Sequence, residues 1–154
     1  MQRRTFLKGS LASGTVAVAV SAGLLTPGTV LAAWPKQAFE AEKMEAAMQG
    51  VFGTAQTQPS DAITIKAPDI AENGAVVPVS VETGMSNVED IAIIAEKNGT
   101  PLAANFKLSS NAKGYVSTRI KMAKTSNVIA VVKSGGKAYS ARKEVKVTIG
   151  GCGG

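Results

Sequence analysis

The chain has 154 residues and a net charge of +6, with no histidine and a single cysteine. The absence of histidine excludes Ser-His-Asp and Cys-His catalytic groups, as well as His-ligated zinc and haem sites. We therefore expect neither an enzyme in its own right nor a resident metal or cofactor.

The N-terminal segment 1–33 has the order of an export signal. Two arginines precede a Phe-Leu pair, a moderately apolar stretch covers residues 9–25, and the sequence Val-Leu-Ala-Ala at 30–33 offers a cleavage site after the small residue Ala32 or Ala33. The paired arginines indicate the twin-arginine route to the periplasm. A membrane anchor is the alternative, but Gly, Ser and Thr in the apolar stretch disfavour stable membrane insertion. The residues expected to carry the signal are Arg3, Arg4, Phe6 and Leu7.

The twin-arginine route carries folded proteins, commonly those with a cofactor or a bound partner. Because no cofactor is expected, we predict that a partner protein folds onto this chain before export. Residues 1–33 hold three of the 17 basic residues and none of the 11 acidic ones, so the remainder has a net charge of +3. That charge is too small to indicate nucleic-acid binding, and aromatic and basic residues do not alternate.

Residues 34–60 are predicted to form a short helix and a linker. Met44, Met48, Val51 and Phe52 have the spacing of one apolar helical stripe, Glu40 and Glu42 lie near the start of the helix, and Gly50 and Gly53 mark its end. We expect this stripe to pack on a sheet or on a partner. Thr54 to Ser60 form the polar linker.

Residues 61–149 read throughout as short strands. Pro78 interrupts one of them, which predicts an edge strand or a bulge there, and Gly135-Gly136 is the strongest hairpin signal. About seven short strands with regular turns are typical of an all-β, immunoglobulin-like β-sandwich. The expected strands are 62–66, 76–82, 88–95, 102–108, 115–122, 128–133 and 138–149.

The sole cysteine, Cys152, lies in the C-terminal sequence 150–154, where all its neighbours are glycine. A lone cysteine is often a small buried hydrophobe, but glycines supply no side chains to bury it. Glycine also has wide backbone freedom, so we predict a flexible arm that spans at most about 16–18 Å and presents the thiol to another molecule. The arm glycines are Gly150, Gly151, Gly153 and Gly154.

The run from Lys146 into the Gly-Gly-Cys-Gly-Gly terminus closely resembles the C-terminus of the SoxY family, the sulfur-substrate carriers of periplasmic thiosulfate oxidation. Residues 68–79 are similar to that family's first-hairpin region, and the twin-arginine leader is similar too. The resemblance implies that Cys152 is the covalent attachment site for sulfur intermediates. It also implies that the chain forms a heterodimer with SoxZ, a second β-sandwich.

The same resemblance implies a set of enzymes that act on the arm. A c-type haem cytochrome would load thiosulfate, a hydrolase would release sulfate, and a sulfane dehydrogenase would oxidise the remaining sulfur. The chain itself offers no histidine base, so we expect each partner to activate the thiol in its own site. Lys143, Lys146 and Arg142 could favour anionic adducts, but they are more typical of a solvated strand face.

Two other functions fit the residues. The chain could be a structural immunoglobulin-like domain of the periplasm in which the cysteine has no role. It could also be a module that dimerises through an intermolecular disulfide, as an odd cysteine in an exported protein suggests. A disulfide oxidoreductase is disfavoured, because there is no second cysteine to resolve a mixed disulfide.

Overall fold

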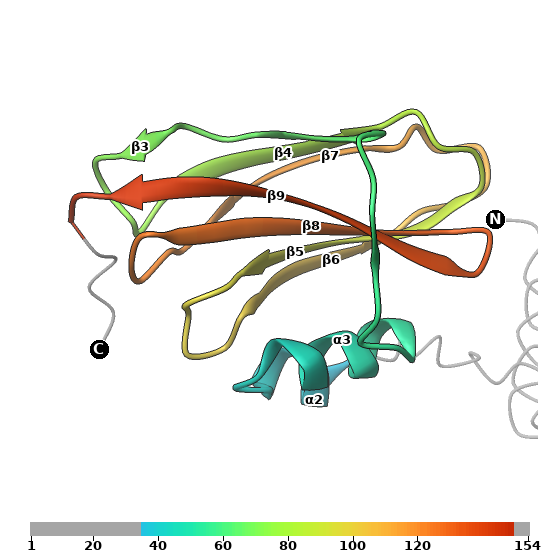
Figure 1. Ribbon diagram of the computed structural model, residues 1–154, viewed down its shortest axis with the longest axis horizontal. Helices are drawn as coiled ribbons and strands as arrows, with labels where there is room; N and C mark the ends of the chain where they lie inside the picture. Colours follow the sequence, from blue (N-terminus) through green and yellow to red (C-terminus); the bar gives the residue numbers. More distant parts are fainter. Residues whose placement is uncertain (1–34, 150–154) are drawn as a thin grey trace, which may run out of the picture. The chain divides into compact units, whose positions relative to one another are not determined.

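Two facing β-sheets form the body of the protein. The computed structural model describes residues 35–149. In the larger sheet the order is β1 (Gln58–Pro59), β9 (Lys137–Val147), β8 (Ser126–Ser134), β5 (Val88–Ala95) and β6 (Leu102–Lys107), with β3 (Ile70–Ala71) also paired to β9. The smaller sheet has the order β2 (Ile63–Lys66), β4 (Val77–Thr83) and β7 (Tyr115–Ile120) (Figure 1).

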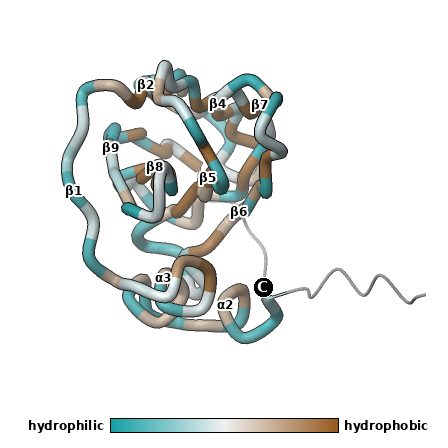
Figure 2. The backbone as a smooth tube through the Cα atoms, turned by 90° about the vertical axis from the view of Figure 1, so that its right-hand side faces the viewer, coloured by the Kyte–Doolittle hydropathy of each residue, from teal (hydrophilic) through white to brown (hydrophobic). Residues whose placement is uncertain are grey.

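The space between the sheets is filled by side chains that alternate along the strands. Val77, Val79 and Val81 of β4 are at most 1% exposed, as the period of two in this strand predicts. They share one core cluster with Ile91 and Ile93 of the opposite sheet. Figure 2 shows the hydrophobic stretches of the chain gathered between the two sheets. The predicted two-sheet β-sandwich is confirmed.

A second core lies on the other face of the larger sheet, where two short helices cover it. These are α2 (Lys36–Glu40) and α3 (Met44–Phe52). Met48 and Phe52 of the predicted stripe are buried against this face, together with Ile94 and Val131. The larger sheet is therefore covered on both faces, which explains why β5 reads as a nearly continuous apolar run.

The helical region contains two helices, whereas the sequence predicts one. Gly53 ends α3 with a left-handed φ of 72°, as predicted. However, Glu40 is the last residue of a separate helix, α2, where a single helix was expected. The prediction that Gly50 marks the helix end is wrong: Gly50 lies inside α3, and a Cβ there would come 2.8 Å from the Cβ of Ala38. A glycine is needed at this position because the two helices approach closely.

The hairpin prediction is confirmed at Gly135-Gly136, which joins β8 to β9 with φ values of 56° and 76°. The prediction for Pro78 is wrong: β4 is the central strand of its sheet, and its pairing with β7 runs without a register shift. The reason is that β2 ends at Lys66, which pairs with Ser80. Pro78 therefore has a paired neighbour on one side only, although its strand is central.

Two strands of two residues each appear where none was predicted. β1 falls in the expected polar linker, and β3 follows β2; both pair in parallel with β9. The predicted signal, residues 1–33, and the predicted arm, residues 150–154, lie outside the described residues.

Candidate functional site at the C-terminal end of β9

The predicted attachment residue, Cys152, and the four arm glycines lie outside the described residues, as do Arg3, Arg4, Phe6 and Leu7. The structure does describe the strand that leads to the arm, as far as Ile149. The geometry of this strand end therefore defines the candidate site.

One side of this strand end is held by the chain around β3. Ile70 is the pairing partner of Lys146, and Ala71 that of Val147. The Lys146 N–H donates to the Asp69 carbonyl oxygen at 2.9 Å, and the Thr148 N–H donates to the Ala71 carbonyl oxygen at 3.1 Å. Figure 1 shows β3 beside the C-terminal end of β9.

The hydrogen bonds continue past the end of the strand to the turn at Asn73-Gly74. The Gly74 N–H donates to the carbonyl oxygen of Ile149 at 2.9 Å, and the Met122 N–H donates to the Gly74 carbonyl oxygen at 2.7 Å. The turn itself is closed by the Ala75 N–H, which donates to Asn73 Oδ1 at 2.9 Å. Ile149 is thereby tied through Gly74 to the loop after β7.

Thr125 holds the other side of the strand end. The Val147 N–H donates to Thr125 Oγ1 at 2.9 Å, and the Thr125 hydroxyl lies 3.5 Å from the Val147 carbonyl oxygen. One threonine side chain thus continues the pairing beyond Ser126, the residue at which β8 begins. The backbone of β9 is therefore held from both sides at Val147, two residues before Ile149.

The three basic residues near the arm do not behave alike. Arg142 and Lys146 are exposed, as expected of a solvated strand face. Lys143 differs, because its Nζ donates to the Ala67 carbonyl oxygen at 2.7 Å and lies 3.0 Å from Asp69 Oδ1. Its ammonium group therefore binds β9 to the chain that precedes β3.

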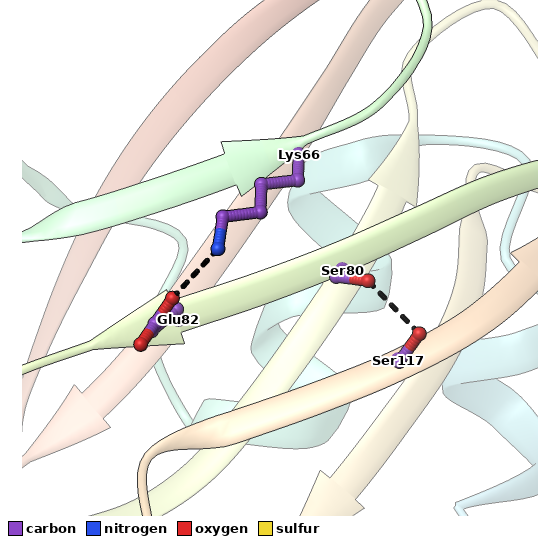
Figure 3. Close-up of polar contacts among 4 residues, drawn as sticks. All are labelled: Lys66, Ser80, Glu82 and Ser117. Atoms are coloured by element: carbon purple, nitrogen blue, oxygen red, sulfur yellow. Dashed lines mark hydrogen bonds and ion pairs between the residues drawn. The ribbon is translucent and has the colours of Figure 1, made fainter.

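The outer face of the smaller sheet carries a second group of polar side chains (Figure 3). Lys66 and Glu82 form an ion pair at 3.0 Å, and the hydroxyls of Ser80 and Ser117 are 2.9 Å apart. Hydrogen bonds from Ser80 and then Ser117 lower the pKa of the Tyr115 hydroxyl below its ordinary value. These groups are partnered within the sheet and form no nucleophile–base arrangement.

Among residues 35–149, no three His, Cys, Asp or Glu side chains gather closely enough to hold a metal ion. In the same part of the chain, no helix combines the length and apolar character needed to cross a membrane.

Sequence reasoning missed the role of the Asn73-Gly74 turn at the strand end. It also missed Thr125 and Asp69 altogether. A threonine just before a strand and an aspartate after a proline are common surface residues, so neither carries a local signal. Their importance arises from contacts with residues 22 to 74 positions further along the chain.

Comparisons with known proteins relate the chain to sulfur oxidation proteins. The family model of the sulfur oxidation protein SoxY matches residues 48–152, a range that includes Cys152. A solved structure of the sulfur carrier protein SoxY from Chlorobium limicola f thiosulfatophilum is 48% identical, covers 70% of this chain and 97% of its own, and has a TM-score of 0.63.

More distant structures share the fold alone. A superoxide reductase (neelaredoxin) from Ignicoccus hospitalis is 17% identical, covers 59% of this chain and 94% of its own, and has a TM-score of 0.51. A search of curated proteins found no match. On the strength of the family match and the Chlorobium relative, the chain belongs to the SoxY family of sulfur oxidation proteins.

Proposed function

We propose that this protein carries sulfur intermediates covalently on Cys152 during thiosulfate oxidation in the periplasm. The observation that carries the proposal is the strand end described above. Hydrogen bonds with Asp69, Ala71, Gly74 and Thr125 hold the end of β9 and the two residues after it, as far as Ile149. The only cysteine follows three residues later among glycines. The short arm that carries the thiol would therefore begin at a residue that hydrogen bonds hold in place.

The loading chemistry needs an external oxidant. The Cys152 sulfur would bond to the outer sulfur of thiosulfate, releasing the thiol proton and two electrons, and the c-type haem cytochrome would accept the electrons. Hydrolysis of the resulting S-thiosulfonate would release sulfate and leave a persulfide on Cys152. A sulfane dehydrogenase would oxidise the outer sulfur to a sulfonate, with three oxygen atoms from water and six electrons passed to the enzyme's own acceptor. A second hydrolysis would then release sulfate and restore the thiol.

The carrier would contribute the thiol, while its partners would contribute the catalytic groups. An ordinary cysteine thiol has a pKa of about 8.5, and the thiolate is the reactive form. The chain has no histidine, and the ammonium group of Lys143, a half-buried cation on β9, is bound to Asp69 and Ala67. We infer that each enzyme lowers the pKa of the thiol within its own site.

The remaining partners follow from the same proposal. SoxZ would form the heterodimer, and the pair would be exported together by the twin-arginine signal in residues 1–33. Co-export of a folded pair would account for the predicted twin-arginine leader on a chain in which we expect no cofactor. The glycines beside Cys152 would let the arm enter narrow channels, since no side chain adds to its width.

Relocating the thiol tests the proposal most sharply. Cys152→Ser should abolish thiosulfate-dependent mass additions and leave the thermal unfolding midpoint unchanged. A matched variant, Cys152→Ser with Ser110→Cys, places one thiol at an exposed position in the loop before β7. It should remain unloaded although its thiol reacts freely with an alkylating reagent. Equal loading at position 110 would contradict the requirement for the arm.

A further inference from the structure

Large hydrophobic side chains are exposed at four positions among residues 35–149. These are Ile70 at 59%, Val76 at 53%, Tyr115 at 49% and Ile149 at 65%. Isolated exposed hydrophobic residues are common on protein surfaces and need no explanation. Here, however, three of the four lie on the segments that meet at the C-terminal end of β9.

Backbone contacts place these three residues close to the origin of the arm. Ile70 is the pairing partner of Lys146, three residues before Ile149. Val76 comes two residues after Gly74, whose N–H donates to the Ile149 carbonyl oxygen. The neighbours Ala71 and Val77 point into the core, at 6% and 0% exposure, whereas Ile70 and Val76 point outward. We call Ile70, Val76 and Ile149 the apolar rim.

The length of the arm limits how far an enzyme can stay from this rim. Cys152 is three residues beyond Ile149, so the two Cα atoms can be at most about 11 Å apart in an extended chain. An enzyme that encloses the Cys152 sulfur must therefore bring its own surface close to Ile149. The enzyme's surface therefore covers the residues around the C-terminal end of β9 each time the two proteins bind.

We propose that the apolar rim is the docking surface for the c-type haem enzyme that loads Cys152, and that it binds an apolar collar around the entrance of that enzyme's active site. The proposal rests on the carrier function proposed above. Three exposed side chains make a small contact area, which suits a transient complex that must release the carrier after each step. Tyr115 belongs to β7 at the end opposite Ile120, the residue paired with Val77, and takes no part in the rim.

The test uses the full chain with its thiol removed, so that docking is measured apart from chemistry. Cys152→Ser carrier should inhibit competitively the loading of wild-type carrier by the c-type haem enzyme with thiosulfate. Adding Ile70→Ser and Val76→Ser should weaken this inhibition roughly tenfold. Adding Tyr115→Ser instead, which removes an exposed ring elsewhere, should leave the inhibition constant unchanged. Circular dichroism and thermal unfolding establish that each variant is folded.

Three results would overturn the proposal. Equal inhibition by all folded variants would show that the rim does not contribute to docking, while normal loading of the wild type would leave the carrier function intact. Loss of association with the second subunit in the Ile70→Ser, Val76→Ser variant would assign the rim to the heterodimer interface instead. Absence of any thiosulfate adduct on wild-type Cys152 would remove both proposals together.

Discussion

The two ends of β9 are held in different ways. At its start, the strand is joined to β8 by the local turn Gly135-Gly136, supported by the Gly136 N–H, which donates to Glu89 Oε1 at 3.0 Å. At its end, segments distant in sequence hold the strand from both sides. The comparison teaches that long-range contacts fix the point from which the cysteine segment departs.

The largest expected effect on stability comes from a buried side chain near the C-terminal end of β9. Val145 is fully buried where β9 approaches its end. Replacing it with alanine removes two buried carbon atoms and leaves a cavity, so Val145→Ala should lower the free energy of unfolding by about 2 kcal/mol. Ile149→Ala, at a residue 65% exposed, should change it by less than about 0.5 kcal/mol. Urea denaturation of both variants checks this, and equal losses would contradict the account.

A change at the hairpin end should reduce stability without reducing carrier function. Gly136 has a φ of 76°, and a Cβ there would meet nothing within 4 Å. Gly136→Ala therefore adds backbone strain alone, which should cost about 1–2 kcal/mol. The rate of thiosulfate loading, measured well below the unfolding midpoint, should equal that of the wild type. A large drop in loading would show that the two ends are coupled.

A smaller loss than at Gly136 is expected for Thr125→Val, which keeps the shape of the side chain and removes its hydroxyl. The Val147 N–H then loses its acceptor, and the free energy of unfolding should fall by about 1 kcal/mol. The more specific signature is faster hydrogen exchange of the Val147 amide, observed by NMR, with exchange in β5 unchanged. Unaltered exchange at Val147 would mean that Thr125 does not hold the strand end.

Much of the fold could be predicted from local patterns. The alternation of Val77, Val79 and Val81 and the Gly135-Gly136 turn are properties of adjacent residues, and both were located correctly. β3 could not be found this way, because two residues carry no periodicity and pair only through Lys146 and Val147. The prediction for Pro78 is wrong for a similar reason, because the number of strands beside this residue depends on where β2 ends.

The candidate site also contains some residues that the sequence predicts and others that only the structure shows. Cys152 and its glycines are visible in the sequence because they are adjacent and unusual. Thr125 and the rim residues Ile70 and Val76 are ordinary in type, and they stand out only once the chain has folded. Lys143 shows the limit most clearly, because only the structure reveals that its ammonium group is bound to Asp69 and Ala67.

The central claim is that Cys152 carries sulfur, and intact mass spectrometry of the protein from cells oxidising thiosulfate tests it most directly. The account predicts mass additions of sulfur or thiosulfate that disappear with reductant and map to Cys152 after proteolysis. An unmodified mass during active thiosulfate oxidation would contradict it, and would favour a structural domain in which the cysteine has no role.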